Sequence, residues 1–125
     1  MKKIKWGILS TAKIAQTALI PGINKSKNSI LHSVASRNSL KARKFASKYL
    51  IPNHYGNYKD LFKDNNVDII YNPLPNHLHL ESTLEAAKNG KHVLLEKPIT
   101  LVAKDVDKLI EVSKKNNVII KEAFM

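Results

Sequence analysis

The chain has 125 residues, no cysteine, and a formal net charge of +11 at pH 7. Its length corresponds to one domain, and its 43% hydrophobic and 25% charged residues are ordinary for a soluble globular protein. This composition excludes disulfides and thiolate chemistry, and no run reaches the ~18 apolar residues that a membrane span requires. Because no long apolar run follows the basic residues at the N-terminus, we expect a cytoplasmic protein.

The positive charge raises the question of a nucleic-acid partner, because Lys and Arg release counterions from phosphates. Lysine supplies 19 of the 21 basic residues, which are spread from Lys2 to Lys121 without a concentrated block. Interfaces that read bases depend on Arg side chains and on a concentrated patch. The pattern therefore favours a solvated lysine surface and predicts no nucleic-acid partner.

Strand-like runs and helical patterns alternate along the whole chain. Apolar, β-rich runs predict strands at 4–10, 30–37, near His54 and Tyr55, and at 67–75, 91–98 and 118–124. Apolar residues at helical spacing predict helices at 12–23, 39–50, through Leu61 and Phe62, and at 77–90 and 101–117. The alternation predicts an α/β fold, with a doubly wound parallel sheet between two helical layers. In such sheets ligands bind beyond the carboxyl ends of the strands.

Particular residues are expected to shape the helix ends. Pro21 interrupts or ends the first helix, because proline lacks the N–H that the helix needs. Asn38 or Ser39 is expected to cap the second helix, and Asn76 could cap the helix at 77–90. Gly90 stands where a C-terminal cap of that helix belongs.

The first strand ends in GILSTAKIA, residues 7–15, where small residues match part of a dinucleotide-binding turn. Ser10, Ala12 and Ala15 occupy the three small positions of the G-x-G-x-x-G/A pattern, which lets the backbone approach a pyrophosphate. Both glycines are replaced, and serine and alanine tolerate a positive φ less well than glycine. Alone, the turn fits either a nucleotide loop or a generic strand-to-helix connection.

The second strand ends in ASRN, which contains no acidic residue. An NAD-preferring site places Asp or Glu here to bind the ribose 2′-hydroxyl, whereas an Arg accommodates a 2′-phosphate. Ser36 and Arg37 supply a hydroxyl and a guanidinium at this position. A solvated arginine at a helix start is the alternative, but together with the preceding turn the pair favours phosphate recognition.

The fourth and fifth strands end in polar residues beside prolines. In YNPLPNHLH, His77 and His79 point about 200° apart if they lie on a helix, so the pair does not predict a metal site. In HVLLEKP, Glu96 and Lys97 would point to opposite faces at the sheet edge, and Lys97 could act as a general acid or base. A strand-end ion pair followed by a helix-starting proline is the alternative.

Taken together, these strand ends resemble the amino-terminal domain of the Gfo/Idh/MocA family of oxidoreductases. EKP at 96–98 is that family's most specific short signature. The segments GILSTAKIA, ASRN, YGNYKDLF, VDIIYNPLPNHLHLESTLEAAKNGKHVLLEKP and KEAFM resemble its NADP-linked branch in order and spacing. That branch includes glucose-fructose oxidoreductases, dihydrodiol dehydrogenases, and xylose or anhydrosugar dehydrogenases. The resemblance implies a Rossmann domain over residues 1–125 that binds NADP, with NAD also possible.

The resemblance also implies roles for individual residues. Lys97 would be the catalytic lysine, which orients or protonates the substrate oxygen while a hydride passes between the nicotinamide and a sugar or small alcohol. The implied cofactor-binding residues are Ser10, Thr11, Ala12 and Ile14 at the pyrophosphate, Ser36 and Arg37 at the 2′-phosphate, Pro73, Leu74, Asn76 and His79 along the nicotinamide ribose, Glu96 and Lys97 beside the nicotinamide, and Glu122 with Ala123 on the last strand.

Members of this family run to about twice this length or more, in line with a two-domain organisation. In the family, a C-terminal α+β domain carries substrate contacts and the usual oligomer interface, and we expect that domain to be absent here. The chain is then expected to bind NADP(H) with little turnover, and to self-associate as a homo-oligomer through the face left exposed. A non-catalytic nucleotide-binding or regulatory module remains the alternative.

Overall fold

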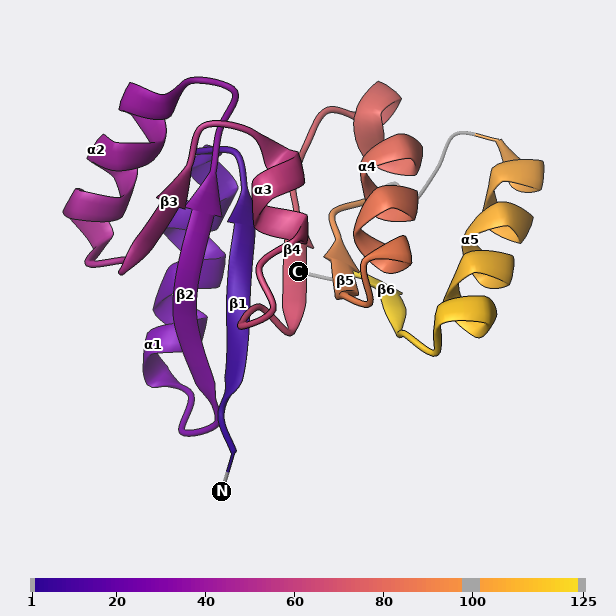
Figure 1. The fold of residues 1–125 in the computed structure, drawn as a ribbon, viewed down its shortest axis with the longest axis horizontal. Coiled ribbons are helices and arrows are strands. Elements are labelled where there is room, and N and C mark those ends of the chain that lie inside the picture. Colours follow the sequence, from indigo (N-terminus) through magenta and orange to yellow (C-terminus); the bar gives the residue numbers. More distant parts are fainter. Residues whose placement is uncertain (1, 98–101, 124–125) are drawn as a thin grey trace.

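The computed structural model describes residues 2–97 and 102–123, and within them six strands form one sheet. The strands are β1 (Ile4–Leu9), β2 (Ser29–Ala35), β3 (Asn53–Tyr55), β4 (Ile69–Asn72), β5 (His92–Leu95) and β6 (Ile120–Glu122). Their order is β3-β2-β1-β4-β5-β6, and all neighbours pair in parallel (Figure 1). Each strand overlaps its predicted range, so the predicted parallel α/β sheet is confirmed.

Helices cover both faces of this sheet. They are the π-helical turn η1 (Ala15–Leu19) and the α-helices α1 (Ile20–Lys25), α2 (Ser39–Tyr49), α3 (Tyr58–Phe62), α4 (Asn76–Lys88) and α5 (Ala103–Asn116). We call the face that carries Leu9 and Ile70 the α4 face, because α3, α4 and α5 pack against it. The opposite face, which carries Ile8 and Val34, packs against η1, α1 and α2 and is called the α1 face.

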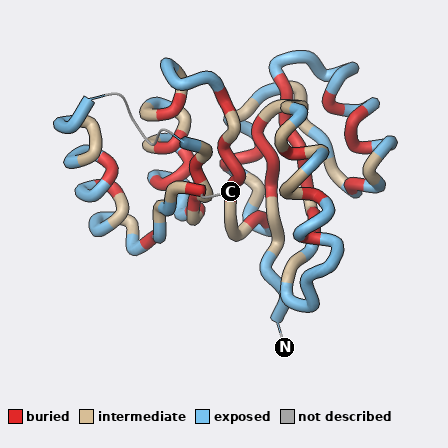
Figure 2. The backbone as a smooth tube through the Cα atoms, turned by 180° about the vertical axis from the view of Figure 1, so that it is seen from behind, coloured by how far each residue is buried: buried red, intermediate tan, exposed pale blue. Residues whose placement is uncertain are grey.

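Apolar side chains fill the space between the layers, so the buried residues lie along the strands and on the inner sides of the helices (Figure 2). Gly7 shows how closely β1 is packed on the α4 face. A Cβ at this position would lie 3.0 Å from Leu61 Cδ1 and 3.2 Å from Ile70 Cδ1. The glycine therefore allows the side chains of Leu61 from α3 and Ile70 from β4 to pack directly over β1.

The segment after β1 departs from the regular helix predicted at 12–23. Ile20 donates its backbone N–H to the carbonyl of Ala15, five residues earlier, which is the hydrogen bond of a π-turn. Helix α1 then continues through Pro21 to Lys25. Pro21 thus interrupts the α-helical pattern without ending the helix, because the wider turn accommodates a residue that has no N–H and a bulky ring.

The helix ends confirm two predicted residues and correct one. Asn38 caps α2, since its side chain accepts a hydrogen bond of 3.1 Å from the Lys41 N–H. Gly90 follows the last turn of α4 with a φ of +78°. The prediction that Asn76 caps α4 is wrong: Pro75, with extended backbone, occupies that position, and Asn76 is already the first helical residue.

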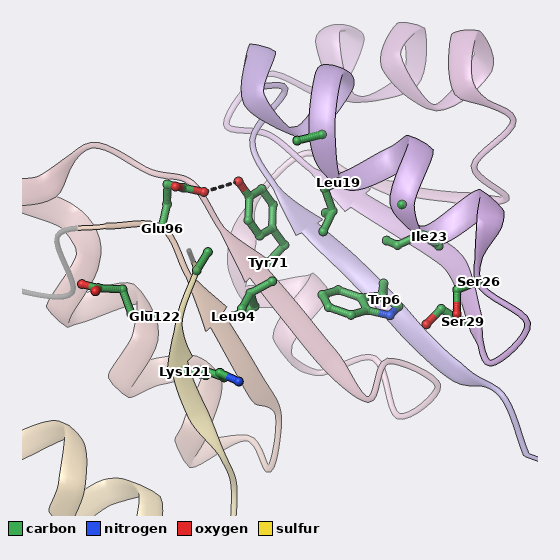
Figure 3. A pocket seen from close by; sticks show the side chains of 13 residues that line it. Trp6, Leu19, Ile23, Ser26, Ser29, Tyr71, Leu94, Glu96, Lys121 and Glu122 are labelled. Carbon is green, nitrogen blue, oxygen red and sulfur yellow. Dashed lines mark hydrogen bonds between the residues drawn. The ribbon is translucent and has the colours of Figure 1, made fainter. Parts of the chain in front are cut away.

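The α1 face of the sheet is covered unevenly. Helices α1 and α2 contact β2, and α2 also contacts β3, whereas α4 contacts β4 and β5 on the α4 face. In the described residues no helix packs on the α1 face of β5 and β6, where Leu94 and Lys121 line an open cavity of about 450 Å³ (Figure 3). None of the helices in 2–97 and 102–123 is long and apolar enough to cross a membrane.

Candidate functional site

The carboxyl ends of the strands lie side by side along one edge of the sheet. Hydrogen bonds between neighbouring strands continue one residue past the strand ends, from Ser10 N to Ala35 O (2.7 Å), Ser36 N to Tyr55 O (3.0 Å), Glu96 N to Asn72 O (3.0 Å) and Ala123 N to Leu95 O (2.8 Å). We call this edge the rim. The strand order reverses direction between β1 and β4, and a crevice for a ligand is expected at such a switch point.

The loop after β1 adopts the backbone conformation that the glycine pattern requires at its first position. Ser10 has a φ of 71°, in the left-handed region that favours glycine. Ala12 is not among the described residues with positive φ. The concern about the replaced glycines therefore applies to Ser10, whose conformation costs about 1–2 kcal/mol for a residue with a Cβ. Ala15, at the third small position, is fully buried against the sheet.

Gln16, which sequence reasoning missed, ties this loop to α2. Its side-chain amide donates to the Thr11 carbonyl at 3.4 Å, and its Oε1 accepts 2.8 Å from the Tyr49 hydroxyl. Ile14 packs with the apolar cluster on the α1 face. The sequence holds no signal for Gln16, since a glutamine in a helix is most often solvated.

After β2, Ser36 and Arg37 lie next to each other in different environments. Ser36 is 8% exposed, and its Oγ accepts a hydrogen bond of 3.2 Å from the Asn38 N–H. Arg37 is exposed, and its guanidinium donates to the Tyr58 hydroxyl. Burial raises the pKa of Tyr58, and the charge and hydrogen bond of Arg37 partly offset that shift. Arg37 is thus held at the rim by α3.

A cavity of about 390 Å³ separates Arg37 from the loop after β4. Its apolar walls come from Tyr58, Phe62, Leu74 and Leu78. Arg37, which the resemblance places at the 2′-phosphate, and Leu74, which it places along the nicotinamide ribose, therefore line the same cavity. Arg37 and Lys97 both lie at the rim, with β1 and β4 between their strands.

Asn72 holds the loop after β4 in place, which sequence reasoning also missed. The fully buried side chain donates to Ser82 Oγ at 2.8 Å and to Thr83 Oγ1 at 3.0 Å, both on α4. Its Oδ1 accepts from the Leu74 N–H at 3.2 Å. A polar amide that ends an apolar strand directly before Pro73 is the signal that could have identified it.

The histidines at the start of α4 lie in different environments. His79 is 1% exposed, whereas His77 is exposed on the helix surface, as is Asn76. This difference agrees with the expectation that two histidines separated by two positions on a helix point in different directions and do not bind the same ligand. The described residues contain no group of three or more His, Cys, Asp or Glu that could hold a metal ion.

Glu96 and Lys97 follow β5, and the structure gives Glu96 a partner that the sequence did not suggest. The hydroxyl of Tyr71 donates to Glu96 Oε2 at 2.6 Å (Figure 3). Burial, together with this hydrogen bond and the carboxylate charge, raises the pKa of Tyr71 well above its usual value. In the described parts of the chain no ion pair joins Glu96 to Lys97, so the alternative of a strand-end ion pair is wrong. Pro98 lies outside the described residues.

The last strand completes the rim. Glu122 and Ala123 line the 450 Å³ cavity together with Tyr71 and Glu96. The end of the predicted strand 118–124 and the start of the predicted helix 101–117 lie outside the described residues.

Comparisons with known proteins agree with this geometry. Residues 4–124 match the Gfo/Idh/MocA family model, an oxidoreductase family with an NAD-binding Rossmann fold. The chain is 38% identical over 120 residues to D-xylose 1-dehydrogenase (NADP(+)) 2 of Haloferax volcanii, which covers 96% of this chain and 37% of that protein. It is 35% identical over 125 residues to trans-1,2-dihydrobenzene-1,2-diol dehydrogenase of Xenopus tropicalis, again covering 96% of this chain and 37% of the relative.

Solved structures show the same fold. A 3-ketoreductase from Actinomadura kijaniata in complex with TDP-benzene and NADP superposes with a TM-score of 0.93 at 29% identity, covering 98% of this chain and 39% of that one. A probable dehydrogenase from Thermotoga maritima gives a TM-score of 0.88 at 28% identity, covering 96% of this chain and 36% of that one. The chain thus spans little more than a third of the length of these relatives.

Proposed function

The chain belongs to the Gfo/Idh/MocA oxidoreductase family, whose Rossmann domain binds NAD(P), and we propose that it binds NADP along the rim. The proposed reaction is that of a dehydrogenase or reductase that acts on a sugar or on a small alcohol or ketone. The left-handed backbone of Ser10 is the observation that carries this assignment, because a strand-to-helix turn without a ligand has no need for a strained non-glycine residue there.

The loop at residues 10–14 fits a pyrophosphate. Ser10 turns the chain sharply at the end of β1, and helical turns begin directly afterwards at Lys13. The first backbone N–H groups of a helical segment lack partners within it, and they can donate to phosphate oxygens. We assign Ser10, Thr11, Ala12 and Ile14 to this part of the cofactor.

The cavity beside Arg37 fits the adenosine end. Phe62 and Leu78 offer an apolar wall for a purine, and the planar guanidinium of Arg37 can stack on a ring or pair with a phosphate. Ser36 has a hydroxyl proton left to donate, because its oxygen serves as the acceptor for Asn38. Glu81 and Glu85 of α4 also line this cavity, but the sequence directly after β2 contains no carboxylate. Ser36 and Arg37 at that position favour a 2′-phosphate and hence NADP over NAD.

The ends of β4 and β5 are assigned to the nicotinamide. Pro73 and Leu74 belong to the connection from β4 into α4, and Asn76 and His79 lie in the first turn of α4. Glu96 and Lys97 extend from β5, with Glu122 on the neighbouring strand. When bound there, a nicotinamide would supply or accept the hydride. The exposed ammonium of Lys97 would hold a proton at Nζ and donate a hydrogen bond to the substrate oxygen, which stabilises negative charge on that oxygen.

Two relatives, a xylose dehydrogenase and a dihydrodiol dehydrogenase, support the proposed substrate class. Residues 1–125 correspond to little more than a third of such proteins. We therefore expect cofactor binding by this chain with little turnover, because positioning of the substrate supplies much of the rate.

Titration of NADPH fluorescence with the chain tests the proposal. We expect saturable binding with enhanced or shifted nicotinamide emission, and competition by NADP⁺. The control ligand is NADH, which lacks the 2′-phosphate and should bind more weakly. Absence of binding at millimolar NADPH, with circular dichroism confirming a folded chain, would refute the proposed function.

A further inference from the structure

Tyr71 connects the sheet core to the rim on the α1 face. Its side chain is 2% exposed and belongs to the apolar cluster that includes Ile8 and Val34. Its hydroxyl reaches the carboxyl edge and donates to Glu96 Oε2 at 2.6 Å (Figure 3). A hydrogen bond to a carboxylate is charge-assisted and stronger than one between neutral groups. Tyr71 therefore restricts a glutamate that would otherwise sample several rotamers.

The register of the sheet sets the position of both partners. Tyr71 pairs with Leu94, two residues before Glu96, in the parallel ladder of β4 and β5. The backbone N–H of Glu96 donates to the carbonyl of Asn72, the residue after Tyr71, at 3.0 Å. The contact between the phenol and the carboxylate is thus built on two rigid strands rather than on the connection that follows residue 97.

The hydrogen bond between Tyr71 and Glu96 also affects Lys97, the residue after Glu96. A carboxylate beside a lysine can neutralise its charge by pairing with it, yet within residues 2–97 and 102–123 the structure shows no ion pair between Glu96 and Lys97. Because Tyr71 binds Oε2 on the α1 face, the ammonium of Lys97 stays available to another acceptor. Oε1 of Glu96 keeps its capacity to accept hydrogen bonds.

We propose that Tyr71 is a positioning residue for the nicotinamide end of the site: its hydroxyl holds Glu96 so that Oε1 accepts a hydrogen bond from the nicotinamide half of the cofactor while Lys97 remains unpaired. The inference rests on the proposed function. Tyr71 acts through Glu96 and does not itself contact the cofactor, since its ring lies in the apolar core below the rim.

Affinity measurements with two ligands test this role. Isothermal titration calorimetry would give dissociation constants of the wild-type chain and of Tyr71→Phe for NADPH and for adenosine 2′,5′-bisphosphate, which lacks the nicotinamide half. We expect Tyr71→Phe to weaken NADPH binding roughly fivefold to tenfold, and to change binding of the bisphosphate less than about twofold, because only the former ligand reaches Glu96.

The matched control is Tyr55→Phe. Tyr55 also donates its hydroxyl to a carboxylate, Asp64, at 2.5 Å, but this pair is not assigned to the nicotinamide end. We expect Tyr55→Phe to leave the ratio of the two dissociation constants unchanged. Glu96→Gln, which leaves the tyrosine in place, provides a second route if Tyr71→Phe does not fold, and it should weaken NADPH selectively.

A double mutant identifies the path of the effect. If Tyr71 acts through Glu96, the double variant Tyr71→Phe/Glu96→Gln binds NADPH within about twofold of Glu96→Gln alone. Equal weakening of both ligands by Tyr71→Phe, unchanged NADPH binding, additive losses in the double variant, or no selective loss in Glu96→Gln would each overturn the inference. Failure of the wild-type chain to bind either ligand would instead overturn the proposed function, and the role of Tyr71 with it.

Discussion

The backbone N–H of Ser10 lies 2.7 Å from the carbonyl oxygen of Ala35, so the loop that follows β1 leaves the sheet beside the end of β2. Ser10 keeps this contact while its own φ is 71°. One residue therefore joins the proposed pyrophosphate loop to the strand that carries Ser36 and Arg37.

Replacing Ser10 with glycine should stabilise the chain. Glycine removes the cost of a left-handed residue with a Cβ but adds freedom to the unfolded chain, so we expect a net gain of about 0.5–1 kcal/mol. Leu50→Gly is the matched control, because Leu50 has a φ of 57° and is 89% exposed, far from any proposed contact. Thermal unfolding should show a higher midpoint for both variants. A lower midpoint for Ser10→Gly alone would show that the serine hydroxyl contributes to stability.

Replacing Arg37 with alanine should erode the preference for NADP over NAD. The guanidinium supplies charge and hydrogen bonds to a 2′-phosphate, so the ratio of the NADH and NADPH dissociation constants should fall by roughly tenfold. Arg43→Ala, an exposed arginine on α2, is the control for loss of one positive charge. An unchanged ratio in Arg37→Ala would remove the assignment of the 2′-phosphate.

The open α1 face of β5 and β6 predicts self-association of the chain. Leu94 lines the 450 Å³ cavity there and is only partly buried, and an apolar face of a parallel sheet is normally covered. Sedimentation velocity over a range of concentrations should show a dimer that Leu94→Glu dissociates. Ile110→Glu, at a residue that is 47% exposed on α5, should leave the association unchanged. A monomer at all concentrations would contradict the prediction.

Replacing Gly7 with alanine should destabilise the fold. The new methyl group would lie 3.0 Å from Leu61 Cδ1 in a packed layer, and overpacking of this kind costs about 1–3 kcal/mol. Gly22→Ala is the control, because a Cβ there meets nothing within 4 Å and alanine favours the helix. Urea unfolding should move the two midpoints in opposite directions. Equal stability of both variants would mean that the α4 face relaxes around the methyl group.

The stability of the chain should decrease in acid partly through Asp64. Burial raises the pKa of this carboxyl, but hydrogen bonds from Tyr55 and from the backbone of Asn66, with the charges of His32 and Lys91, outweigh that effect and lower it overall. A lowered folded pKa stabilises the protein above the unfolded value of about 3.9, and this contribution is lost as pH falls through the folded pKa. Urea unfolding between about pH 5 and 2 should therefore lose stability more steeply for the wild type than for Asp64→Asn. Parallel profiles would contradict this.

The alternation of apolar runs and helical spacing was sufficient to predict the sheet, because both signals are local. The parallel arrangement then placed Ser36 and Glu96 at one edge, although 60 residues separate them in the sequence. The sequence narrows the cap of α2 to Asn38 or Ser39, because a capping side chain bonds only three residues ahead, and the structure selects Asn38. The expectation that Asn76 caps α4 is wrong because the helix begins one residue earlier than its residue preferences indicate, with Pro75 at the N-cap position and no side-chain cap.

Contacts that depend on register could not be predicted in this way. Tyr71 and Glu96 are 25 residues apart, and their hydrogen bond exists because β4 and β5 pair with Tyr71 beside Leu94. Gln16 and Tyr49 are 33 residues apart and lie on η1 and α2, and nothing in the spacing of apolar residues indicates their hydrogen bond or the π-turn.

The π-turn at Ala15–Leu19 also gives the protein a place where its length can change. Such a turn contains one residue more than an α-helical turn, so deletion of one residue there would convert the segment to an ordinary helix. The proposed pyrophosphate loop before it and the buried Ile23 after it could then keep their neighbours. Within this segment, variation in sequence length is compatible with an unchanged rim, and Pro21 is the residue that would oppose the shorter form.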